Sequence, residues 1–250
     1  MRSVFLFAHQ DDEYGIYAAL HRHVCQGDSV YCAYLTDGGP LAQRRRQESL
    51  TVLGALGVVP EHVYFPGCEY AWQDGRLHTH YAACCRWVAQ LLANLAPVGD
   101  VYIPAWEGGH PDHDSVHMAA VTAVRHRGEN TRIWQFPLYN GYRCWGPMFR
   151  TMLPLPANGP VHTTPIAPAL RLYFVRLCLR YPSQWKTWLG LFLPVALRYM
   201  ITGAQQLQAI YPKQPSKPHE GRLYYERRGF CSWQTLKAAL AVDPFEVQHD

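Results

Sequence analysis

The stretch Ser3-Val4-Phe5-Leu6-Phe7-Ala8-His9-Gln10-Asp11-Asp12-Glu13 decides the fold of this 250-residue chain. Its first six residues form an apolar run of β-strand length, and a histidine and three acidic residues follow close behind. In an open parallel sheet, ligands bind at the carboxyl ends of the strands. Residues 9–13 therefore mark a candidate site where this strand ends.

The residues after this stretch alternate between helix and strand patterns. Ile16, Leu20 and Val24 share one face of a helix pattern, and Gly27-Asp28 then turns the chain. Strands are predicted over residues 3–8, 29–36, 62–66, 100–104 and 132–136, and helices over 14–25, 41–56, 81–95 and about 112–126. This alternation predicts a Rossmann-like α/β fold, a mostly parallel sheet with helices on both faces.

The alternation ends at Pro137. Residues 137–168 contain seven prolines, which predicts loop or extended chain. Helices are predicted over 170–181 and 185–202, with Pro194 as a candidate kink. We therefore expect one domain over residues 1–250, with an α/β core at 1–136 and a C-terminal loop-and-helix elaboration at 137–250.

Composition excludes several classes of protein. With 48% hydrophobic and 17% charged residues, the chain is neither disordered nor a coiled coil. Its eight cysteines form no C-x-x-C pair, which favours reduced thiols and a cytoplasmic location. The apolar run at 3–8 is too short for a signal peptide, and no stretch reaches the roughly 18 apolar residues of a membrane span.

The charge of the chain is unevenly distributed. The net charge is +4, but residues 130–219 contain no Asp or Glu and ten of the 23 Lys and Arg residues. The rest of the chain has the other 13 basic residues and all 19 acidic ones, a balance of −6. This asymmetry predicts an anionic substrate or an anionic surface near the basic part.

Two clusters of histidine and aspartate follow separate strands of the predicted sheet, at 9–13 and at 107–113. Because both strands end at the same edge, the clusters can converge in space. Two imidazoles and a carboxylate are a common ligand set of catalytic zinc, which leaves its fourth position to water. One such cluster alone is more often a helix cap or a surface feature, but the pair together favours a metal site.

These residues resemble a known family. Ala8-His9-Gln10-Asp11-Asp12-Glu13 and His110-Pro111-Asp112-His113 are similar to the metal motifs of the LmbE-like / PIG-L family of zinc-dependent N-deacetylases. Thr36-Asp37-Gly38, Arg45-x-x-Glu48 and Leu56-Gly57 match its supporting pattern, so that the likeness covers about residues 3–140. A later match at Gln206-Leu207, Tyr211 and Gln214 is weak and lacks the lysine of the family.

The resemblance implies a role for each motif residue. His9, Asp12 and His113 would bind zinc, and Asp11 would be the general base that takes a proton from the metal-bound water. His110 would stabilise the tetrahedral intermediate and protonate the leaving amine.

The resemblance also implies supporting residues. Asp112 would orient a histidine, and Arg45 would contact the substrate or the developing oxyanion. Gln10 replaces the usual proline, with little expected effect because its side chain is not a ligand. His117, four residues after His113, offers a further ligand, but we expect it to be structural or on the surface.

The same residue types suit amide hydrolysis without the resemblance. Zinc, or another divalent transition metal, acidifies its water to a pKa of about 7 and polarises a carbonyl. A carboxylate next to that water is a competent base, and a histidine facing it is a competent acid. Because Asp11 and Asp12 are adjacent, their side chains diverge, so one can bind metal while the other faces the water.

We therefore expect a hydrolase that removes an acetyl group from an N-acetylated amino sugar, of the N-acetylglucosaminyl type, in a glycoconjugate. The substrate would be a small or lipid-linked molecule, with an anionic group in view of the charge asymmetry. The alternatives are a metal-dependent amidase for a larger acyl-amino-sugar conjugate and a non-catalytic sugar- or lipid-binding module. No motif that reads nucleic-acid bases is present.

Residues 170–202 mix aromatic and aliphatic side chains with five basic ones. One interpretation is a basic amphipathic surface that contacts anionic lipid at the membrane periphery. The other is a helical cap packed on the sheet with its arginines outward, and we favour the cap. Substrate choice is expected to depend on this C-terminal part.

Overall fold

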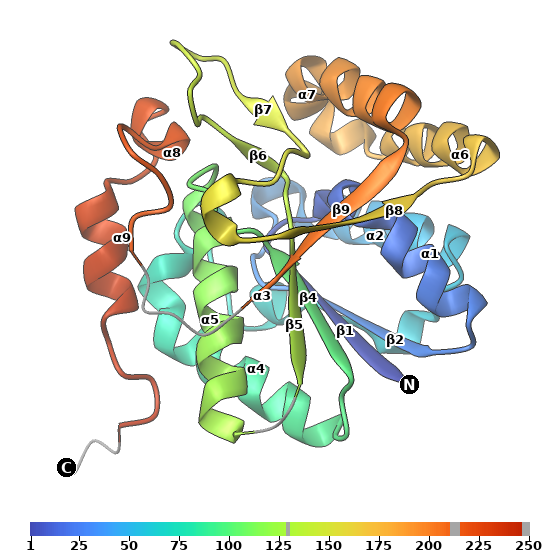
Figure 1. The fold of residues 1–250 in the computed structure, drawn as a ribbon. Coiled ribbons are helices and arrows are strands. Elements are labelled where there is room, and N and C mark those ends of the chain that lie inside the picture. The colour runs from blue at the N-terminus through green and yellow to red at the C-terminus, as the bar shows by residue number, and fades with distance from the viewer. Residues whose placement is uncertain (129–130, 211–215, 247–250) are drawn as a thin grey trace.

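The computed structural model describes residues 1–128, 131–210 and 216–246. They form a seven-stranded sheet in the order β3-β2-β1-β4-β5-β9-β8, with helices on both sides (Figure 1). The strands are β1 (Arg2–Phe7), β2 (Ser29–Tyr34), β3 (Val63–Tyr64), β4 (Asp100–Pro104), β5 (Arg132–Phe136), β8 (Val161–Pro165) and β9 (Ala204–Ala209). Of the residues named above, Tyr211 and Gln214 lie outside the described part. The expected Rossmann-like α/β fold is confirmed.

Strand β1 lies inside the sheet, between β2 and β4, and is buried on both faces. Phe5 and Phe7 pack in one hydrophobic core, with helices on that side, and Val4 and Leu6 pack in the core on the other side. The first side is covered by α1 (Tyr17–Cys25), α2 (Ala42–Ala55), α6 (Pro168–Cys178) and α7 (Trp185–Leu197), and the second by α4 (Tyr81–Asn94) and α5 (Pro111–Arg127). Alternation of side chains along an apolar strand thus builds both cores.

The sheet reverses its direction of growth between β1 and β4. From β1 the chain adds β2 and then β3 on one side, and it then adds β4 and β5 on the other side. The loops after β1 and β4 therefore diverge and leave a crevice between them, which is where ligands bind in sheets of this kind. Both His/Asp clusters stand in these two loops, as their positions in the sequence predicted.

The C-terminal part adds strands that the sequence did not reveal. Strand β9 pairs antiparallel with β5, and β8 pairs antiparallel with β9 at the sheet edge. A short hairpin of β6 (Tyr139–Asn140) and β7 (Arg150–Thr151) precedes them. The segment over 137–168, predicted as loop or extended chain, thus contains three short strands among its described residues. The pattern is hidden because β8 is exposed along its length and β9 is rich in glutamine.

Two buried glutamines explain how polar β9 fits into the sheet. Gln205 donates to the carbonyl of Gly15, and Gln208 donates to the carbonyls of Leu155 and Gly159. These hydrogen bonds satisfy the amide nitrogens that burial removes from water.

The predicted helix over 185–202 is two segments. α7 runs through Pro194 to Leu197, and a π-helical turn (η7, Arg198–Thr202) then leads to Gly203, which has φ of 56°. Trp188, Leu191 and Val195 face the core, so α7 caps the sheet as expected. Its outer side is not mainly basic, however, because large apolar side chains are exposed there.

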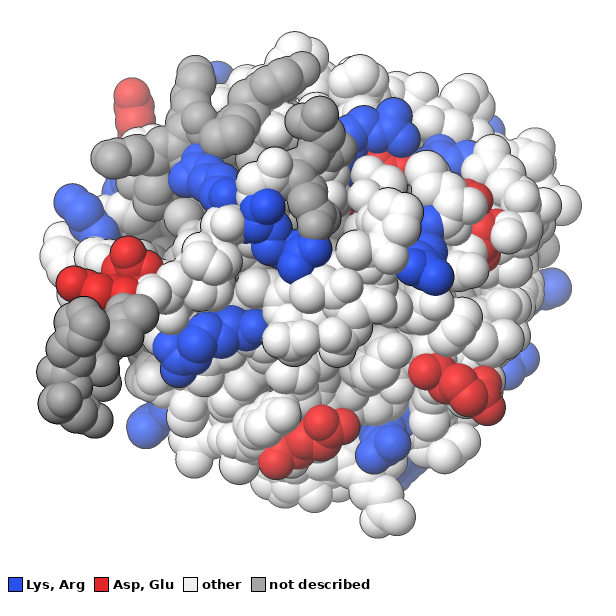
Figure 2. Space-filling view, turned by 90° about the horizontal axis from the view of Figure 1, so that it is seen from below, with Lys and Arg blue, Asp and Glu red and all other residues white. Residues whose placement is uncertain are grey.

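Figure 2 shows the end of the molecule opposite the carboxyl edge of the parallel strands. Basic and acidic side chains both occur on this face, separated by uncharged residues. Among the described residues, no helix has the length and apolar composition needed to cross a bilayer.

Candidate active site

The loop after β1 directs two adjacent carboxylates to different partners. Asp11 has φ of 136°, a backbone region that residues other than glycine rarely adopt. Asp12 begins a short 3-10 helix (η1, Asp12–Gly15), and its Oδ2 accepts hydrogen bonds from the backbone amides of Ala8 (3.0 Å) and His9 (2.8 Å). Asp12 is thereby held against the end of β1, whereas Asp11 lies beside Arg45, with 4.0 Å between Oδ1 and Nη2.

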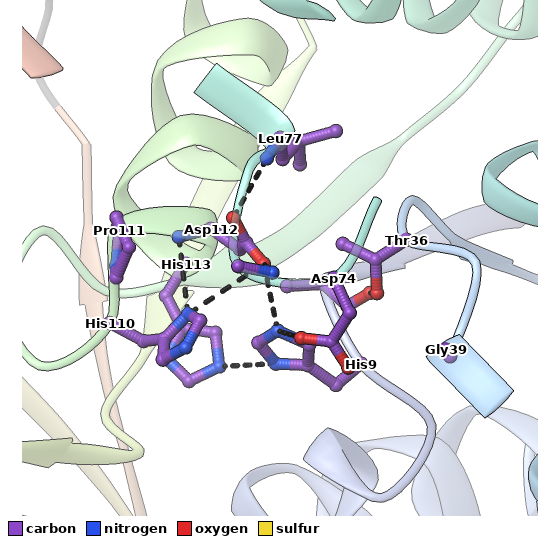
Figure 3. A network of polar contacts seen from close by, with 12 residues as sticks. His9, Thr36, Gly39, Asp74, Leu77, His110, Pro111, Asp112 and His113 are labelled. Atoms are coloured by element: carbon purple, nitrogen blue, oxygen red, sulfur yellow. Dashed lines mark hydrogen bonds and ion pairs between the residues drawn. The ribbon is translucent and has the colours of Figure 1, made fainter. Parts of the chain in front are cut away.

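The loop after β4 leads into the first turn of α5. His110 is the N-cap residue of this helix, and its Nδ1 accepts a hydrogen bond from the backbone amide of Asp112 at 3.2 Å. Pro111 follows at the first helical position, where a missing N–H costs nothing. The capped turn presents His110 and His113 to the end of β1 (Figure 3).

His9, Asp12 and His113 converge although about 100 residues separate them in the sequence. Their candidate ligand atoms all lie within 4.8 Å of one another. His9 Nδ1 lies 3.2 Å from His113 Nε2, which lies 3.1 Å from Asp12 Oδ1. All three side chains are buried. The structure thus brings together the three residues proposed as metal ligands.

Asp112 lies behind this group, where it holds His9. Its Oδ2 accepts from His9 Nε2 at 3.0 Å and from the Gly75 amide at 2.6 Å, and its Oδ1 accepts from the Leu77 amide at 2.9 Å (Figure 3). A proton on His9 Nε2 leaves the lone pair on Nδ1, the atom that faces His113 and Asp12. A carboxylate that fixes the tautomer of a histidine in this way is common around metal sites.

Asp74 also reaches the site, although no sequence motif pointed to this residue. Its Oδ1 lies 3.3 Å from His9 Nε2, and its Oδ2 accepts from Arg45 Nη1 at 2.8 Å. Asp74 lies in the loop between α3 (Pro66–Glu69) and α4. It does not directly follow a strand and belongs to none of the motifs. The Asp74-Gly75 pair predicts only a turn.

A second group, His9, Asp74, His110 and Asp112, also has ligand atoms within 4.8 Å of one another. Its oxygens are already engaged, since Asp112 accepts from two backbone amides and Asp74 pairs with Arg45. Asp12 Oδ1, in contrast, contacts His113 Nε2 and accepts no hydrogen bond from a backbone amide of the described residues. The first group is therefore the better fit for a cation.

The charges at the site also suit a cation. Burial alone would lower the pKa of His9, but the carboxylates of Asp74 and Asp12 outweigh it and raise this pKa well above its usual value. The negative charge that holds a proton on His9 would also hold a divalent metal. Two imidazoles and one carboxylate are moreover the donor set that zinc takes in catalytic sites.

Asp11 and His110 have pKa values shifted in opposite directions. Burial raises the pKa of the Asp11 carboxyl to about 7, and the nearby Arg45 guanidinium limits this rise. Burial, with the charge of His9, lowers the pKa of His110 to about 3. His110 is therefore neutral at pH 7, and because its Nδ1 accepts the Asp112 amide, its proton is on Nε2.

Two cavities that share lining residues lie at the site. One of about 500 Å³ is lined by His9, Asp11, Asp12 and His110 from the core, and by residues of the C-terminal part: Tyr139, Phe149, Lys186, Leu191, Tyr224, Arg228 and Phe230. A second, of about 790 Å³, lies between residues 37–41, 73–76 and 183–187. Arg45, Asp74 and Lys186 line both. The C-terminal wall lies beyond the motifs, so the sequence could indicate only the region.

Other predicted residues lie as follows. Gln10 points away from the ligand group and donates to the Thr36 carbonyl at 3.2 Å. Arg45 projects from α2 and also donates to the Gly38 carbonyl at 3.3 Å. His117 is buried, and its Nδ1 lies 2.9 Å from the Pro104 carbonyl, on the strand side of α5.

Solved structures with the same fold include enzymes of more than one kind. A deacetylase of the teicoplanin pathway, in complex with bog, is 17% identical with a TM-score of 0.65, over 86% of this chain and 100% of that chain. The zinc-inhibited form of a teicoplanin deacetylase is 18% identical, with a TM-score of 0.63 and the same coverage. N,N'-diacetylchitobiose deacetylase from Pyrococcus horikoshii is 16% identical, with a TM-score of 0.58 over 84% and 83% of the two chains.

A hydratase also shares the fold. The 4-carboxy-2-hydroxymuconate hydratase of Pseudomonas putida KT2440 is 15% identical, with a TM-score of 0.52 over 86% of this chain and 99% of that chain. The fold alone therefore does not determine the reaction.

The family assignment comes from the sequence. No curated protein matches the chain. The sequence model of the PIG-L family, described as GlcNAc-PI de-N-acetylase, matches residues 4–124, the part that contains His9, Asp12 and His113. Residues 4–124 of the chain thus match the PIG-L (LmbE-like) family, whose members are metal-dependent deacetylases that hydrolyse amide bonds.

Proposed function

We propose that this chain is a zinc-dependent N-deacetylase that removes the acetyl group from an N-acetylated amino sugar within a larger glycoconjugate. The proposal depends above all on the convergence of His9, Asp12 and His113 beside a cavity that Asp11 also lines. Hydrolysis adds water across the amide C–N bond and releases acetate and the free amine. When bound by these three residues, zinc supplies an acidified water and polarises the carbonyl.

Asp11 is the proposed proton carrier. With a pKa of about 7 it is partly ionised at neutral pH, the range in which a general base is most effective. It accepts a proton from the attacking water and then gives it to the amide nitrogen as the C–N bond breaks. Arg45, paired with Asp74, keeps a positive charge beside Asp11 and the incoming carbonyl.

His110 is the proposed stabiliser of the tetrahedral oxyanion. A neutral imidazole with its proton on Nε2 donates a hydrogen bond but does not supply a proton at pH 7. The low pKa of His110 therefore favours oxyanion stabilisation over the second role that the resemblance implied, protonation of the amine.

The two cavities support a substrate larger than one monosaccharide. The first has the size of a small-molecule site, for which about 300–1,000 Å³ is typical, and the second shares Lys186 with it as a lining residue. Lys186 and Arg228 have no carboxylate partner among the described residues. We propose that they bind an anionic group on the part of the substrate beyond the acetylated sugar.

The relatives support this substrate class and leave the metal to be tested. Two of the structural neighbours are deacetylases of teicoplanin and of diacetylchitobiose, both of which are glycoconjugates or oligosaccharides. One neighbour is a zinc-inhibited form, so Mn²⁺, Co²⁺ and Ni²⁺ belong beside Zn²⁺ in the assay.

The test follows acetate release from N-acetylglucosamine and its phosphorylated and glycosidic derivatives, with metal content measured on the same protein. Asp11→Asn should keep the metal and lose about 10²–10⁴-fold in turnover, the usual contribution of a general base. Asp28→Asn, which alters a carboxylate at the opposite end of β1, should behave like the wild type. Bound metal with unchanged turnover in Asp11→Asn would refute the assignment of the base.

Two other functions remain distinguishable. An amidase for a larger acyl group would release a longer acid from acyl-amino-sugar conjugates, with little acetate from N-acetyl sugars. A sugar-binding module would bind its ligands but release no acid from them, whichever metal is supplied. The complete set of ligands and base disfavours such a module.

A further inference from the structure

One side of residues 185–201 exposes large apolar side chains. Trp185, Leu189, Leu193, Leu197 and Ile201, which we call the apolar stripe, are between 47% and 80% exposed. Residues four apart are neighbours on a helix surface, so the stripe is continuous along α7 and its π turn. The opposite side of α7 is already packed against the core. The apolar stripe therefore stays exposed to solvent in the folded chain.

A contiguous apolar surface of this kind marks an interaction site. Its surroundings are basic. The neighbouring helix α6, which packs against α7, exposes Arg176, and the turn after α6 exposes Arg180. Lys186 is exposed at the start of α7. Residues 131–210, which supply both helices, contain no Asp or Glu. An occupant of this face therefore meets apolar groups flanked by positive charge.

This charge pattern decides between two occupants. In a symmetric dimer formed through the stripe, the same face of each copy would meet, and the arginines of both copies would be brought together. An anionic bilayer offers apolar chains below negative headgroups and complements both features. We propose that α7 docks on an anionic lipid surface, with the apolar stripe in the interface and Arg176 and Arg180 at the headgroups.

The position of α7 relates this surface to the cavities. Lys186 and Thr187, in the first turn of α7, line both of them. The loop between β6 and β7 lies at the same end of the molecule as α7 (Figure 1) and exposes Trp145 and Met148. If the protein docks through α7, this helix lies in the plane of the membrane surface, and the two cavities are near the membrane.

The test is co-sedimentation of the full chain with vesicles of phosphatidylcholine, with and without about one-third phosphatidylglycerol. The wild type should bind the anionic vesicles more tightly, and salt should weaken this binding through screening. Leu189→Ser with Leu193→Ser should reduce partitioning at least about tenfold, and Arg176→Gln with Arg180→Gln should remove most of the preference for phosphatidylglycerol. The matched control is Val59→Ser with Val242→Ser, which changes two exposed apolar residues elsewhere.

Unfolding midpoints are measured for each variant, so that loss of binding is interpreted only for folded protein. Equal sedimentation of the wild type and the Leu189/Leu193 variant would overturn the proposal. Absence of vesicle binding by the wild type would also overturn it. If the wild type is instead a dimer that the Leu189/Leu193 variant dissociates, the apolar stripe is an interface with a second copy of the chain. None of these measurements depends on the deacetylase activity.

Discussion

Replacing Asp112 by asparagine tests how the candidate site is held together. Asp112 does not line the cavities, yet its two oxygens accept hydrogen bonds from His9 Nε2, from the Gly75 amide and from the Leu77 amide. Asparagine has the same shape but only one oxygen. Whichever way it is turned, its NH₂ group must face at least one of these N–H donors.

Both orientations are costly, in different ways. If the asparagine oxygen faces Leu77, the NH₂ group faces both the Gly75 amide and His9 Nε2. It then repels the Gly75 N–H and donates to Nε2. This favours the other tautomer of His9, in which Nδ1 carries the proton and cannot bind metal. If the oxygen faces His9 and Gly75, the Leu77 amide is left buried and unpaired. An unpaired buried donor costs about 1–3 kcal/mol of stability. Loss of a carboxylate that orients a ligand lowers metal affinity about 10–100-fold.

The assay is a competitive zinc titration of the apo-protein against a chromophoric chelator, with urea unfolding of the same apo-protein. The matched control is Asp100→Asn. Asp100 is a buried carboxylate at the amino end of β4, bonded to Arg132 and to Trp134. The control should lose stability and keep zinc affinity. If Asp112→Asn keeps zinc affinity within about twofold of the wild type, Asp112 only stabilises the fold and the positioning role is refuted.

Three further predictions concern other parts of the chain. Burial lowers the pKa of His117 to about 4, below the usual value of 6.5, so this group contributes stability that is present above pH 6.5 and lost as pH falls toward 4. Between pH 7 and pH 5 the wild type should therefore lose about 2 kcal/mol more than His117→Gln in urea unfolding, and equal losses would contradict the shift. Gly109→Ala would place a Cβ 1.9 Å from the Tyr139 carbonyl oxygen, so the loop before His110 must move, with a loss of about 1–3 kcal/mol and weaker metal binding. The control for this change is Gly54→Ala in α2, where a Cβ meets nothing within 4 Å and stability should instead rise by about 0.5–1 kcal/mol. Lys186→Met should raise KM about fivefold for a phosphorylated substrate and leave kcat and the neutral substrate unchanged, and an equal effect on both substrates would exclude an ionic contact.

The sequence was sufficient for the part of the site that depends on local order along the chain. An apolar run followed by His9-Gln10-Asp11-Asp12 is both a strand and its polar carboxyl end. The motif at 110–113 is both a helix start and a cluster of ligands. Because parallel strands end at one edge, knowing the two local structures is enough to predict that the motifs meet.

Long-range features were hidden for identifiable reasons. Asp74 enters the site through a loop whose path depends on the packing of the chain between β3 and α4. Strand β9 is stabilised by glutamine hydrogen bonds to distant backbone carbonyls, so it lacks the apolar pattern that marks a strand. The apolar residues of α7 fall on both of its sides, and their pattern does not show which side the core covers.

The proposed chemical groups and the cavity wall come from different parts of the chain, with a boundary at about residue 124. The family match ends there, and every proposed metal ligand, base and stabilising residue lies before it. The wall of the cavities that faces them comes from later residues such as Tyr139, Lys186 and Arg228. Because the wall and the ligand set come from different parts of the chain, either can vary while the other is kept. Deacetylases and a hydratase share this fold, so the fold alone does not determine the reaction. We therefore propose that the choice of substrate depends on the basic C-terminal part.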